Sequence, residues 1–115
     1  MILTEFGIMP SIDRNKEYND YEPEQYNCIS IDDDLYIDAW WEELEKIDTY
    51  FHGINNPSKA LNRHGITLIP PESLTKFEDI VINDKRLSSD PSLIKLLELI
   101  RTAKKEEKFM IHFGI

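Results

Sequence analysis

Apolar residues recur at helical spacing between residues 32 and 51. On a helical wheel of about 100° per residue, one apolar stripe is centred on Leu44: Ile37, Trp40, Leu44, Ile47 and Phe51. Three aspartates precede it at residues 32–34, where carboxylates cap a helix and favour its macrodipole. His52-Gly53 follows, with glycine at the usual place just past a helix end. We therefore predict an amphipathic helix over residues 35–51, with Trp40 in the core and Trp41 at its margin.

Four shorter apolar runs have the length and residue types of β-strands: residues 2–9, 26–31, 66–69 and 108–115. Two further helices are predicted, over residues 71–81 and from residue 91 onward, because each opens on a proline. Asp90 stands at the N-cap of the second, and residues 59–63 are predicted as one helical turn. The order β-β-α-β-α-α-β indicates one α+β or α/β domain, in which a small mixed sheet of about four strands packs against three helices.

Residues 10–26 are predicted as a long polar loop, since prolines and asparagines interrupt any periodic pattern. Loops of this length without secondary structure are uncommon in compact domains and are often functional. Tyr18, Tyr21 and Tyr26 lie in it among several acidic residues. They are compatible with a loop that binds a partner and with a loop that covers the edge of the sheet.

Charge is unevenly distributed along the 115 residues, a length that suits one domain. Residues 1–50 contain 14 Asp and Glu against 3 Lys and Arg, a balance of −11, whereas residues 51–115 contain 8 against 10, a balance of +2. The two balances sum to the net charge of −9. An acidic half of this kind repels nucleic-acid phosphates and favours either a basic protein partner or simply solubility.

The sequence indicates a cytoplasmic protein. No apolar run approaches the length of a membrane span, and the N-terminus lacks the basic region and cleavage site of a signal peptide. Cys28 is the only cysteine, so an internal disulfide is excluded.

Catalytic chemistry has few candidate residues. Cys28 and His112 lie in predicted strands, where packing is their commonest role, and His52 and His64 each precede a glycine at the end of an element. Phosphate-binding, zincin and hydrolase motifs do not occur in the sequence. The aspartates at residues 32–34 lack the spacing of a calcium loop, so we favour helix capping over metal binding. The sequence predicts no cofactor, no metal and no enzyme activity.

Several stretches resemble the bacterial immunity proteins of contact-dependent and other polymorphic toxin systems. They are Tyr26–Ile29 (YNCI), Ala39–Leu44 (AWWEEL), Gly65–Leu74 (GITLIPPESL) and Ile111–Ile115 (IHFGI). The resemblance implies a cognate toxin domain as partner, typically a nuclease with a basic active-site cleft. An acidic helix could fill such a cleft as a phosphate mimic, or bind beside it.

We therefore expect an immunity protein that neutralises a basic toxin domain through an acidic surface centred on the helix over residues 35–51. The predicted contact residues combine carboxylates with one aromatic anchor: Asp33, Asp34, Asp38, Trp41, Glu42, Glu43 and Glu45. Trp41 should matter most, because interface energy concentrates in a few aromatic and arginine residues. The alternatives are a regulatory or structural subunit that binds another basic protein, and a small hydrolase using carboxylates with His52 or His64.

Overall fold

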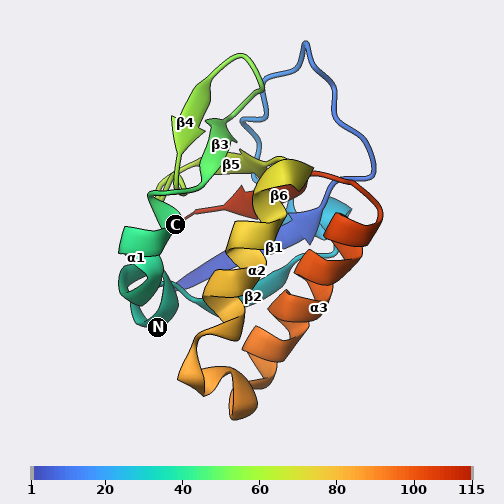
Figure 1. Cartoon of the computed structure of the whole chain (residues 1–115). Helices are drawn as coiled ribbons and strands as arrows, with labels where there is room; N and C mark the ends of the chain where they lie inside the picture. The colour runs from blue at the N-terminus through green and yellow to red at the C-terminus, as the bar shows by residue number, and fades with distance from the viewer. Residues whose placement is uncertain (1, 115) are drawn as a thin grey trace.

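Within residues 2–114, which the computed structural model describes, six strands form one antiparallel sheet and three α-helices pack on it (Figure 1). The strands are β1 (Leu3–Ile8), β2 (Ile29–Asp32), β3 (Asp48–Phe51), β4 (Pro57–Lys59), β5 (Ile66–Ile69) and β6 (Met110–Phe113). Their order across the sheet is β2-β1-β6-β5-β3-β4. The helices are α1 (Asp38–Leu44), α2 (Leu74–Ile82) and α3 (Pro91–Lys105).

The α+β class, the four predicted strands and the three predicted helices are confirmed. Three finer expectations are wrong: the mixed sheet, the number of about four strands, and the order along the chain. The sheet is antiparallel at every neighbouring pair among the described residues, not mixed. It also contains β3 and β4, so the order along the chain is β-β-α-β-β-β-α-α-β. Of the predicted last strand, Ile115 lies outside the described residues.

The helix predicted over residues 35–51 is much shorter in the structure. Residues 33–37 form a π-helical turn that Asp32 caps, its carboxylate accepting from the Leu35 amide at 3.0 Å, and α1 then ends at Leu44. Residues 48–51 pair as strand β3, because threonine, tyrosine and phenylalanine favour a pleated, half-buried surface. His52 follows that strand at a φ of 65° and so does not close a helix.

The predicted apolar stripe centred on Leu44 is nevertheless confirmed. Four of its five residues are buried in the main core, which are Ile37, Trp40, Leu44 and Ile47. The predicted helical turn at residues 59–63 is absent from the described structure, because residues 57–59 pair in β4 and Ala60 has a φ of 59°.

The sheet has an apolar core on each of its faces. The three helices cover one face, and Figure 1 shows α2 and α3 lying across it. On the other face a second cluster combines strand residues with the long loop: Met9, Tyr18, Ile66, Leu68, Ile111 and Phe113. The loop is fixed there by the Tyr18 amide, which donates to the His52 carbonyl at 2.6 Å. The segment of residues 10–26 therefore has a structural role as the cover of this face.

The two later helices begin as the sequence predicts. Pro71–Ser73 form a 3-10 turn that leads into α2, and the Asp90 carboxylate caps α3 by accepting from the Ser92 amide at 2.9 Å. Two basic residues of α3 bind an acid of α2: Arg101 and Lys104 donate to Glu78 at 2.9 and 2.8 Å. Among the described residues, none of the helices has the length and apolarity needed to cross a membrane.

Candidate protein-binding surface

Helix α1 divides its two tryptophans between the core and the surface, as the sequence predicts. Trp40 is 5% exposed and packs between the Tyr36 ring, at 5.4 Å between centroids, and the Phe77 ring, at 6.5 Å. Trp41 is half-buried at the edge of the same core. It is therefore placed where an aromatic side chain can contact a partner.

Five exposed carboxylates lie on α1 and its immediate ends, and we call them the α1 acidic face: Asp34, Asp38, Glu42, Glu43 and Glu45. Glu43 pairs with Lys46 at 3.2 Å, and Asp38 pairs with Arg63. Asp34, Glu42 and Glu45 form no ion pair within residues 2–114. Their charges are therefore directed to solvent.

Asp33 differs from the other predicted contact residues because it is buried. Its side chain is 1% exposed and forms an ion pair with Arg63 beneath the surface, while its Oδ1 has no hydrogen-bond partner among the described residues. Asp33 therefore holds the surface together from below and is not part of the exposed face.

Arg63 is the residue of this surface that sequence reasoning missed. Its guanidinium binds Asp33 and Asp38 together and lies 5.5 Å from the centre of the Trp41 ring. The hydrogen bond to Asp33 is the main reason that the pKa of Arg63 is raised above its ordinary value. Only tertiary folding brings it to Asp38, 25 positions away in sequence, so no local pattern could have indicated it.

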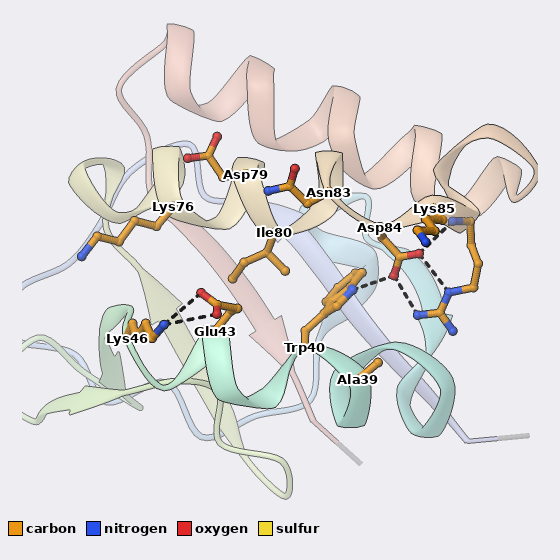
Figure 2. A pocket seen from close by; sticks show the side chains of 11 residues that line it. Ala39, Trp40, Glu43, Lys46, Lys76, Asp79, Ile80, Asn83, Asp84 and Lys85 are labelled. Atoms are coloured by element: carbon orange, nitrogen blue, oxygen red, sulfur yellow. Dashed lines mark hydrogen bonds and ion pairs between the residues drawn. The ribbon is translucent and has the colours of Figure 1, made fainter.

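A groove of about 710 Å³ separates α1 from α2 on the other flank of α1 (Figure 2). Trp40 and Ile80 line it, and Figure 2 shows the Trp40 indole N–H directed at Asp84, at 2.8 Å from Oδ2. The Arg86 guanidinium donates to both oxygens of Asp84, at 2.9 and 2.7 Å, which keeps the pKa of that carboxyl well below its usual range. Charges of both signs line this groove, so it has no preference for a basic partner.

His112 is packed in the core, as predicted, and its hydrogen bonds define its tautomer. The Thr4 hydroxyl donates to the Phe113 carbonyl at 3.0 Å, so it accepts from His112 Nε2–H at 2.5 Å. The bare Nδ1 then faces the Thr67 hydroxyl at 3.4 Å. Burial lowers the pKa of His112 to about 3, so the ring is neutral and structural.

The other candidate catalytic residues are dispersed. His52 uses both ring nitrogens, Nδ1 toward the Tyr18 carbonyl at 2.9 Å and Nε2 toward the Asn62 amide at 3.3 Å, whereas His64 is exposed. Burial is the main cause that raises the pKa of the Cys28 thiol to about 12, which opposes formation of a thiolate. Within residues 2–114, no three His, Cys, Asp or Glu side chains are grouped so that they could hold a metal ion.

The fold and surface define an acidic α+β domain with five exposed carboxylates on α1 and its immediate ends. No family model matches the chain, and no curated protein does. Among solved structures the chain is similar to the Neisseria DNA mimic protein DMP12, with a TM-score of 0.55 and 17% sequence identity. The match covers 98% of this chain and 99% of that one. At this identity it shows a shared fold over nearly the whole of both chains.

Proposed function

We propose that this protein is an acidic inhibitor that binds the nucleic-acid-binding surface of a basic protein and occupies it in place of nucleic acid. The observation that carries the proposal is the α1 acidic face, whose Asp34, Glu42 and Glu45 carboxylates lack ion-pair partners among the described residues. Like charges one turn apart destabilise a helix. Glu42 and Glu45, which lie away from the helix N-terminus, therefore do not stabilise the helix, whereas a basic partner would neutralise them.

The spacing of these carboxylates suits a surface built for phosphates. At about 1.5 Å of rise per residue, Asp38, Glu42 and Glu45 are distributed over roughly 10 Å of helix axis. Three successive phosphates of one DNA strand cover roughly 7 Å of duplex axis. The carboxylates are therefore spaced somewhat more widely than the phosphates, and long, flexible cationic side chains arranged for one row could contact the other.

The structural neighbour supports this proposal by its name, which describes that protein as a DNA mimic. The resemblance to immunity proteins suggests a nuclease toxin domain as one partner with the required basic cleft. We propose such a domain as the favoured target, and a DNA-binding protein outside toxin systems as the alternative target of the same surface. In both cases the α1 acidic face does the binding.

Binding is proposed here in preference to catalysis. The His52 ring is held by Tyr18 and Asn62 through both nitrogens, and the raised pKa of Cys28 keeps its thiol protonated. Neither residue is therefore prepared to act as a base or a nucleophile.

The test is capture of a partner by the immobilised protein, followed by competition with duplex DNA. We expect the captured protein to bind DNA by itself and to be released by an excess of duplex. The charge-reversed variant Glu42→Lys/Glu45→Lys should lose capture. The matched control is Glu72→Lys/Glu98→Lys, which changes the net charge equally at two exposed positions outside the α1 acidic face. A partner that stays bound in excess duplex, or equal losses in the two variants, would contradict the proposal.

A further inference from the structure

A second cavity lies on the side of the molecule where the long loop meets the start of β1. It has a volume of about 690 Å³ and is lined by residues of the loop, of β1, of the segment before β5 and of the end of β6. The lining residues that matter here are Ile2, Leu3, Glu5, Tyr21, His64 and Phe113. The functional surface described above does not include this cavity.

The walls of the cavity combine apolar surface with one carboxylate. Ile2, Leu3 and Tyr21, which are 42%, 49% and 64% exposed, together line this one cavity. The Tyr21 ring packs edge-on against Phe113 at 5.5 Å, and its hydroxyl donates to the Glu5 carboxylate. These groups suit a long side chain with an apolar stem and a cationic head.

The carboxylates of Glu5 and Glu24 act on the ionisable groups beside the cavity. The hydrogen bond to Glu5 is the main cause that raises the pKa of Tyr21 to about 12, and the charge of Glu24 raises it further. The same two carboxylates add to the effect of burial on the Cys28 thiol nearby. The charges of these two carboxylates favour a bound cation over a bound anion.

The cavity also lies next to the α1 acidic face. Its wall residue His64 follows Arg63, which binds Asp33 and Asp38, and the carbonyl of its wall residue Ile2 accepts from the Asp33 amide at 2.7 Å. On the side of the loop, Tyr21 stands between Asp20 and Glu22 in the sequence. A partner seated on the α1 acidic face would therefore extend over the cavity.

We propose that the cavity bounded by Glu5, Tyr21 and Phe113 receives an arginine side chain of the basic partner. Arginine fits better than lysine because its planar guanidinium can stack on the exposed Tyr21 ring while it donates to the Glu5 carboxylate. Ile2 and Leu3 would cover its aliphatic stem. This inference rests on the proposed function, to which it adds a specific anchor outside α1.

The cavity can be tested without the partner, by NMR titration with N-acetyl-arginine amide as the probe. We expect saturable shifts at the amides of Glu5, Tyr21, Gly65 and Phe113, and clearly weaker binding of the neutral N-acetyl-citrulline amide. Glu5→Gln should weaken the binding about fivefold, since an exposed charge pair contributes up to about 1 kcal/mol. The control Glu98→Gln, on the exposed side of α3, should leave it unchanged, and the spectra report whether each variant is folded.

Three results would overturn the assignment: no saturable shifts at these amides, equal affinity for citrulline, or unchanged affinity in Glu5→Gln. Equal affinity for N-acetyl-lysine amide would overturn the preference for a guanidinium. Failure of this inference is distinguishable from failure of the proposed function. If Glu5→Gln binds the captured partner as tightly as the wild type while duplex DNA still competes, the anchor is wrong and the proposed function stands. If arginine binds the cavity but duplex never competes, the proposed function fails instead.

Discussion

Replacing each tryptophan of α1 by alanine tests whether the helix is oriented as described. Trp40 is buried between Tyr36 and Phe77, and emptying a core aromatic position costs about 3–5 kcal/mol of unfolding free energy. The same substitution removes the indole N–H from Asp84, although that carboxylate keeps its hydrogen bonds from Arg86. For a domain of this size the loss corresponds to roughly 12–20 °C in Tm.

Trp41→Ala should cost much less, about 1–2 kcal/mol, because the side chain is only half-buried and its contact with Arg63 is a partly exposed cation–π interaction. Urea denaturation of both variants at pH 7 measures the difference, and Trp40→Phe separates packing from the hydrogen bond to Asp84 by retaining an aromatic ring. A Trp41→Ala variant that is as unstable as Trp40→Ala would refute this orientation of α1, and with it the position of the α1 acidic face.

Two further predictions concern buried ionisable groups. Because the folded pKa of His112 is about 3 and the unfolded value is near 6.5, the unfolded chain binds more protons as pH falls through this interval. The free energy of unfolding should therefore drop by up to about 1.4 kcal/mol per pH unit below pH 6.5. Urea denaturation between pH 7.5 and 4.5 measures this slope, which the His112→Gln variant should lack. Asp33→Asn should cost about 2–4 kcal/mol in the same denaturation assay, since it breaks a buried ion pair with Arg63, whereas Asp38→Asn, at the exposed end, should cost less than about 1 kcal/mol. Equal costs would mean that the burial of Asp33 contributes little.

Local signals in the sequence were sufficient for most of the fold. Short apolar runs identify β1, β5 and β6, and a proline at the start identifies α2 and α3, because these features act within a few residues. The helical stripe around Leu44 also predicts correctly that Trp40 is buried and Trp41 is marginal.

The end of α1 could not be read from the same pattern. Phe51 continues the helical phase of Ile47, although residues 48–51 pair with β4 and β5. A run of four residues fits either period, and the choice is made by partners distant in sequence, such as the Ala60 carbonyl, which accepts from the Thr49 hydroxyl at 2.7 Å. Strand β4, three residues long and opened by a proline, carries almost no signal of its own.

The candidate surface was likewise predictable only in part. Its exposed carboxylates are visible in the composition of residues 34–45. The burial of Asp33 and its pairing with Arg63 depend on how the segment before β5 folds back against the π-helical turn, which is a long-range contact. The cavity beside Tyr21 gathers residues from both ends of the chain, and no spacing in the sequence brings them together.

The most direct test of the central claim is the rate of association with the captured partner as a function of salt. Steering by a charged surface can raise association rates by roughly 10–10³-fold at low ionic strength. It is screened as the Debye length falls to roughly 8 Å near 0.15 M salt. We predict that Glu42→Lys/Glu45→Lys associates more slowly than the wild type and with a flatter salt dependence, while Glu72→Lys/Glu98→Lys stays close to the wild type. Equal rates and equal salt slopes for the wild type and the first variant would contradict the claim that the α1 acidic face binds a basic partner.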